Sequence, residues 1–165
     1  MADAYEASKI TRTITVTQEM RAILSWIKID ITKTIKESGA CATAALKLVE
    51  LMEDEDTHSS VSAGPACDCL VTACRKMILG IEDLLDKEKM SKHELSTSVF
   101  QINALYESAC TDFKAETELM KGLNPVGWDV QMSATEVLEC MEAICEIVGG
   151  AAQSIEWLQQ VLPIA

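Results

Sequence analysis

The residues best suited to chemistry in this chain of 165 residues are its seven cysteines, three of which lie in Cys67-Asp-Cys69-Leu-Val-Thr-Ala-Cys74. Thiolates bind soft metals such as Cu(I) and zinc, but zinc sites use cysteine pairs with about two to four residues between them, at a tight turn. On a helix, Cys67 and Cys74 share one face, whereas Cys69 lies on another. Cys67 and Cys74 are therefore the candidate ligands of a thiol site for copper or zinc. We favour the alternative that these cysteines are small apolar core residues and that the chain holds no metal.

The two histidines offer little support for an enzyme. A di-iron bundle needs Glu-x-x-His on two helices, and Glu55-x-x-His58, the one match, falls in an expected connection. His93 falls in a first helical turn, whereas phosphotransfer histidines lie exposed in the middle of a helix. The chain has no nucleophile elbow, and its adjacent glycines, Gly149 and Gly150, fall inside an expected helix rather than a phosphate-binding loop. We therefore expect no catalytic residues and no cofactor.

The acidic residues suggest a protein partner. The formal net charge is -12, which is unfavourable for binding nucleic acid or an anionic membrane surface. The last expected helix carries Glu139, Glu142 and Glu146 on one stripe and contains no Lys or Arg. These three residues are the candidate partner-binding site, for a basic or amphipathic helix of another protein. The alternative is that they form a solvated surface.

Hydrophobic spacing predicts the elements that position these residues. In the last two thirds of the chain, apolar side chains recur at alternating steps of about three and four residues, which is the pattern of a buried helix face. Neighbouring apolar residues widen each face into a stripe that suits packing against two other helices in a bundle. The three faces comprise Cys67, Leu70, Cys74, Met77, Ile81 and Leu84; Leu95, Val99, Ile102, Tyr106, Ala109, Phe113 and Met120; and Ala134, Val137, Met141, Ile144, Val148, Ala151, Ile155, Leu158 and Leu162.

The first third of the chain allows more than one interpretation. The spacing from Val16 to Ile35 suits a helix, but residues 11–17 and 27–31 alternate and are rich in β-branched side chains, so a strand or hairpin is also possible. We favour the helix, because a lone hairpin would have no sheet to join. Gly39 either ends this helix or lies within it at a cost of about 1 kcal/mol.

Capping signals define the boundaries of the later helices. Ser91 with Glu94, and Ser133 with Glu136, match the capping box, in which the hydroxyl accepts a backbone N–H of the first turn. The expected connections are residues 54–64, 86–92 and 122–127. The sequence therefore predicts an all-α fold, a single up-and-down helical bundle of four or five long helices. Residues 1–165 would form one domain, with residues 1–9 as a frayed N-terminus.

Composition and targeting signals complete the functional expectation. The start of the chain has no apolar signal segment, and no run approaches the ~18 apolar residues of a membrane span, so we expect reduced thiols and a cytoplasmic location. The expected function is a non-enzymatic protein–protein interaction module, acting as an adaptor, scaffold or regulator through exposed helix faces. The alternatives are a copper- or zinc-binding thiol bundle and a carrier of an apolar ligand in a Met-rich core. An oligomer is possible.

Overall fold

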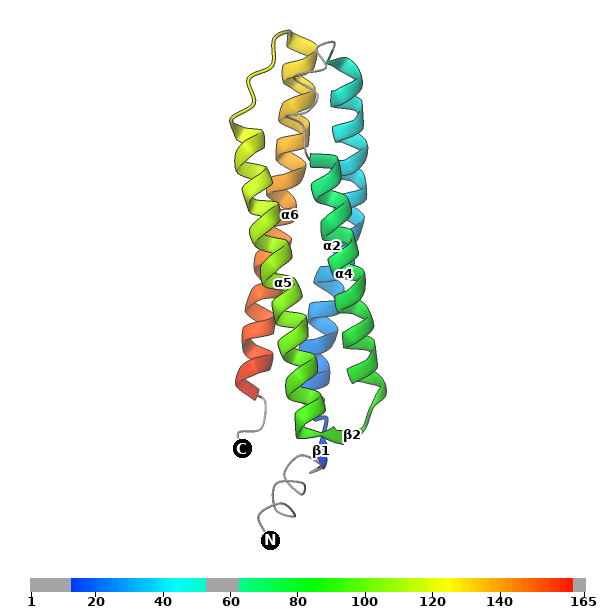
Figure 1. Cartoon of the computed structure of the whole chain (residues 1–165). Helices are drawn as coiled ribbons and strands as arrows, with labels where there is room; N and C mark the ends of the chain where they lie inside the picture. The colour runs from blue at the N-terminus through cyan, green and yellow to red at the C-terminus, as the bar shows by residue number, and fades with distance from the viewer. Residues whose placement is uncertain (1–12, 53–62, 162–165) are drawn as a thin grey trace.

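The fold is an up-and-down bundle of four helices, as the sequence predicts (Figure 1). The computed structural model describes residues 13–52 and 63–161. Successive helices run antiparallel, so that α2 begins and α6 ends at the same end of the bundle (Figure 1). The helices are α2 (Gln18–Leu51), α4 (Ala63–Asp86), α5 (Lys92–Lys121) and α6 (Trp128–Val161).

One hydrophobic core runs the length of the bundle and receives side chains from all four helices. The predicted helix faces are confirmed, because their described residues are buried. Ala109 alone is half-buried, and Cys110 beside it faces the core instead. Leu162 lies outside the described residues. None of the helices in the described part of the chain has both the length and the apolar character that crossing a membrane requires.

The first helix does not break at Gly39. α2 continues through this residue to Leu51, which reduces the predicted four or five helices to four. Ser38 and Cys41 on either side of the glycine are completely buried. Their packing outweighs the roughly 1 kcal/mol that an interior glycine costs a helix. Thr17 caps the start of the helix, and its hydroxyl accepts the backbone N–H of Met20 at 3.2 Å.

The preference for helix at residues 13–15 was wrong. Thr13–Thr15 form a short strand, β1, that pairs antiparallel with β2 (Lys89–Ser91) in the turn between α4 and α5. Ile14 lies opposite Met90, and the Val16 N–H donates to the Glu88 carbonyl at 2.9 Å. A strand needs a partner, and the turn expected at residues 86–92 supplies one.

Arg21 fixes the same end of the bundle. Its guanidinium donates to the Leu85 carbonyl and to the Lys87 carbonyl, both at 2.6 Å. These carbonyls belong to the end of α4 and the residue that follows it, where backbone acceptors have no partner within the helix. The charged donor therefore ties the start of α2 to the end of α4.

One of the two predicted N-terminal caps forms. Ser91 caps α5 and accepts the Glu94 N–H at 3.1 Å. The box at Ser133 was wrong, because α6 begins five residues earlier, at Trp128. Ser133 therefore lies inside the helix, where its hydroxyl is buried without a hydrogen-bond partner. The preceding connection does form, and Gly127 there adopts a φ of 105°, which favours glycine.

Several predictions fall on residues that the structure does not describe. They are the frayed N-terminus at residues 1–9, the Glu55-x-x-His58 pattern, and the connection up to residue 62. Residues 63 and 64, which we expected in that connection, already belong to α4. Pro65 then occupies the first turn of this helix, where its missing N–H costs nothing.

Candidate functional site

A groove lies between α4 and α5 in the described part of the chain. It encloses about 470 Å³ and runs along the first half of α4 and the second half of α5. Its floor contains Leu70, Leu105 and Phe113, which continue into the core. The groove exists because alanines occupy four of the positions that line it, where larger side chains would close the space between the helices: Ala66, Ala73, Ala109 and Ala115.

The charged residues of this groove are all acidic. Asp112 and Glu116 lie one helical turn apart on α5 and both line it, whereas no Lys or Arg does. Asp112 is exposed and Glu116 is half-buried. An apolar floor beside carboxylates can accept a segment that carries both apolar and basic side chains.

Cys69 contributes a thiol to the same groove. All seven cysteines lie in the part of the chain that the structure describes, all are free, and Cys69 alone is exposed. It lies on a different side of α4 from the buried pair Cys67 and Cys74, as helical spacing predicts. Cys69 therefore provides a natural chemical reporter of whatever covers the groove.

The candidate metal ligands Cys67 and Cys74 are both core residues. Burial raises the pKa of Cys74 to about 12. Cys67 lies beside Cys41 of α2, and the two thiols interact. This interaction lowers the pKa of Cys67. The same interaction, together with burial, raises the pKa of Cys41. Among residues 13–52 and 63–161, no group of three or more His, Cys, Asp and Glu side chains is arranged to hold a metal ion. Both side chains pack in the hydrophobic core.

The candidate partner-binding residues Glu139, Glu142 and Glu146 are all exposed on α6. A lysine lies on each side of this stripe. Glu139 shares a cleft of about 510 Å³ with Lys47 of α2. On the other side, Glu142 is one of the charges that raise the pKa of Lys121 of α5. The charge of the stripe is therefore partly compensated by these two lysines.

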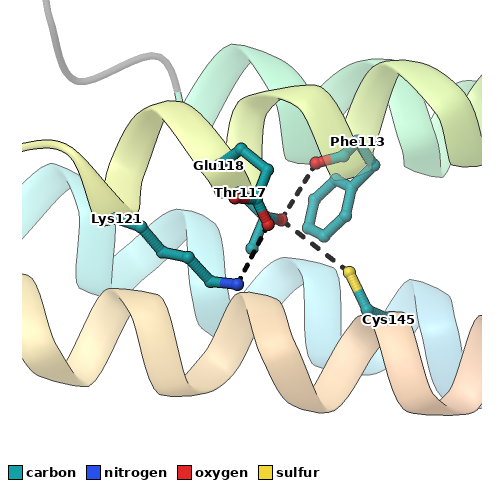
Figure 2. Close-up of polar contacts among 5 residues, drawn as sticks. All are labelled: Phe113, Thr117, Glu118, Lys121 and Cys145. Carbon is teal, nitrogen blue, oxygen red and sulfur yellow. Dashed lines mark hydrogen bonds and ion pairs between the residues drawn. The ribbon is translucent and has the colours of Figure 1, made fainter.

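The contacts at the end of α5 show how Lys121 is held (Figure 2). Its ammonium donates to the Glu118 carboxylate at 2.9 Å, and this hydrogen bond is the main cause of its raised pKa. Thr117 turns inward, donates to the Phe113 carbonyl at 2.9 Å and lies 3.8 Å from the Cys145 sulfur of α6 (Figure 2). These polar and sulfur contacts join α5 to α6.

The sequence argument missed the groove, although a signal for it was present. Ala66 and Ala73 are seven residues apart on α4, and Ala109 lies beside the predicted apolar face of α5. Small residues at the edge of two neighbouring helix faces predict a depression where those edges meet. Locating it required knowing that α4 and α5 are neighbours and in which register they pack.

No protein-family model matches this chain, and a search of curated proteins finds no match either.

Proposed function

We propose that this chain is a non-enzymatic interaction module that binds a basic amphipathic helix of another protein in the α4–α5 groove. The observation that carries the proposal is the combination of an apolar floor with a lining whose charged residues are both acidic. A helix that docks in a groove inserts apolar side chains at steps of about three and four residues and leaves its polar face at the rim. Lys or Arg on that polar face would lie near Asp112 and Glu116.

The size of the groove supports a short helical segment. Ala66 and Ala73 lie about 10 Å apart along α4, given the rise of about 1.5 Å per residue. This length accepts two or three apolar side chains from successive turns of a partner helix. The overall charge of -12 would also speed the approach of a basic partner and discourage binding of nucleic acid.

The two alternative functions have less support. A thiol metal site would need more ligands around Cys67 and Cys74 than the described residues bring together. A carrier of an apolar ligand needs internal space, and the core cavity beside Cys74 and Tyr106 encloses only about 10 Å³. A cytoplasmic location belongs to the proposal, because seven free thiols persist best in a reducing compartment.

The proposal is tested with a pair of synthetic helical peptides on the full chain. Both peptides carry leucines on one face, and their polar faces carry either lysines or glutamates. We expect saturable binding of the lysine peptide by fluorescence anisotropy, weakening as salt rises, and at least about ten-fold weaker binding of the glutamate peptide, a difference near 1.4 kcal/mol. Equal binding of the two peptides would contradict the proposal that the acidic residues of the groove select a basic helix.

Two variants locate the binding face. Ala73→Trp fills the groove and Asp112→Lys reverses one of its charges, so each should weaken the lysine peptide about ten-fold or more. The matched control is Glu146→Lys, which makes the same charge change on α6, away from the groove. If Glu146→Lys weakens binding and Asp112→Lys does not, the α6 stripe of Glu139, Glu142 and Glu146 is the partner site and the groove is not.

Cys69 gives a readout that does not depend on substitution. A peptide in the groove should slow alkylation of Cys69 by iodoacetamide, measured by mass spectrometry at increasing peptide concentration. Unchanged alkylation at saturating peptide would place the bound helix elsewhere on the bundle.

A further inference from the structure

Two of the three tryptophans are far apart in sequence but contact each other on the outside of the bundle. The rings of Trp26 on α2 and Trp157 on α6 have centroids 6.3 Å apart and are inclined by 71°, so the edge of one faces the plane of the other. Their side chains nevertheless remain 51% and 43% exposed. The edge-to-face contact holds both rings in place while it leaves indole surface open to solvent.

These rings form part of a shallow cleft. It encloses about 400 Å³ and is lined by the two tryptophans together with Ile29, Asp30 and Ser154. The cleft is open to solvent, so it would cover one side of a small ligand rather than enclose it. The cleft is separate from the α4–α5 groove, since α2 and α6 build it.

The polar groups of the cleft differ in how they are used. The Ser154 hydroxyl donates to the Gly150 carbonyl at 3.4 Å. Asp30 is half-buried, and one of its carboxylate oxygens lies against Gly150, where an added Cβ would come within 3.6 Å of it. None of the ion pairs among the described residues includes Asp30. Lys33, one turn further along α2, does not line the cleft.

We propose that the Trp26–Trp157 cleft binds an organic cation of the trimethylammonium type. The face of an indole ring attracts cations more strongly than any other side-chain ring. The Asp30 carboxylate adds an opposite charge in a partly dehydrated position. The remaining lining consists of Ile29 and of Ser154, whose hydroxyl proton is already donated to Gly150, so it suits a methylated ammonium that has no N–H group and is weakly hydrated. A primary ammonium would lose more of its water in the same place.

The test uses tryptophan fluorescence in a Trp128→Phe background. Trp128 is exposed at the start of α6 and does not line the cleft, so its replacement leaves Trp26 and Trp157 as the only emitters. Choline should change the emission saturably. Its neutral isostere, 3,3-dimethylbutan-1-ol, should bind at least about ten-fold more weakly, because it has the same shape without the charge. Equal binding of the two compounds, or no saturable change with choline, would overturn the proposal.

Two substitutions separate the contributions of charge and ring. Asp30→Asn should weaken choline about ten-fold and leave the neutral isostere unchanged. Trp157→Leu keeps an apolar wall but removes the π face, and it should reduce the preference for choline over the isostere. The matched control is Asp129→Asn, which removes a carboxylate from the far end of α6. Circular dichroism verifies that each variant folds, and unchanged choline affinity in folded Asp30→Asn would contradict the site.

Two sources can present the same cation, and two ligands distinguish them. The first is choline itself, and the second is a short peptide carrying trimethyllysine, compared with its unmethylated form. Binding of choline as tight as that of the peptide indicates a free small cation. Peptide binding at least about ten-fold tighter than choline, and lost without methylation, indicates a modified protein. Binding of the unmethylated peptide as tight as that of the methylated one would overturn the proposal.

Discussion

The two ends of the bundle are built from different side chains. The lower half, which contains β1 and β2, packs large aliphatic residues from all four helices. The upper half, which contains the start of α4 and the end of α5, buries many small, sulfur or hydroxyl side chains beside large ones such as Leu48, Phe113 and Met141 (Figure 1). The fully buried residues of the lower half include Ile27, Ile31, Ile81, Leu84, Leu95 and Ile155; those buried in the upper half include Ser38, Cys41, Ala45, Ala63, Cys67, Cys110, Thr117, Ser133 and Ala134.

This difference explains how each half can present a surface to a ligand. In the upper half, α4 has 24 residues against the 34 of α2, and its alanines leave the α4–α5 groove open. In the lower half the core is filled, and the cleft is formed by large side chains, Trp26 and Trp157, added outside it. A ligand site can therefore arise either from missing volume between helices or from rings placed on their outer faces.

The sharpest test of the comparison is one substitution made in each half. Leu84 in the lower half and Leu48 in the upper half are both fully buried. Replacing a buried leucine by alanine costs about 3–5 kcal/mol, and the cost is lower where the surroundings can collapse into the cavity. We expect Leu84→Ala to cost about 4 kcal/mol and Leu48→Ala about 3 kcal/mol, measured by urea unfolding. Equal losses would mean that the two halves are equally rigid.

Arg21 should account for the next largest effect. Arg21→Ala removes two short charge-assisted hydrogen bonds to backbone carbonyls of the lower half, and we expect a loss of about 2 kcal/mol. Arg75→Ala is the control, because Arg75 is exposed on the middle of α4, and its loss should stay below about 0.5 kcal/mol. A similar small loss for Arg21→Ala would show that its two hydrogen bonds add little to the packing and strand pairing that hold this end.

Alkaline pH tests Cys74, which lies where the two halves meet. Its pKa is raised by burial from 9.0 to about 12. The unfolded chain therefore releases this proton near pH 9, while the folded chain keeps it until about pH 12. The contribution of Cys74 to the free energy of unfolding is therefore fully present below pH 9. Above pH 9 it falls by about 1.4 kcal/mol per pH unit.

The measurement compares urea unfolding at pH 8 and pH 10.5 in reductant. Cys74→Ala should lose less stability than the parent chain over this interval, whereas Cys69→Ala, at the exposed thiol, should behave like the parent. If Cys74→Ala shows the same loss as the parent, the thiol is hydrated in the folded state.

The smallest expected effect is a gain. The hydroxyl of Ser133 is buried in α6 of the upper half without a hydrogen-bond partner. Ser133→Ala removes that unpaired group and introduces a better helix former, so we expect about 1 kcal/mol of added stability by thermal unfolding. Ser96→Ala, on the exposed surface of α5, reports the helix propensity alone. No gain beyond that of Ser96→Ala would show that the Ser133 hydroxyl is hydrated.

The hydrophobic periodicity of the sequence by itself determined the helices and the side chains that form the core. The spacing of residues such as Leu70, Met77 and Ile144 gives each helix one apolar face. These residues are buried because such a face is stable only when it packs against neighbouring helices. The Ser91 cap was predictable for a similar reason, since all of its partners lie within three residues. Local spacing suffices wherever the interacting groups are close in sequence.

Tertiary packing alone decided the features that depend on which helices are neighbours. Gly39 stays helical because the residues on either side of it are buried, and Ser133 is not a cap because α6 begins earlier. Thr13–Thr15 become a strand because a partner lies more than seventy residues away, at Lys89–Ser91. The α4–α5 groove and the Trp26–Trp157 cleft likewise join residues from separate helices, and no spacing within one helix specifies the register in which two helices meet.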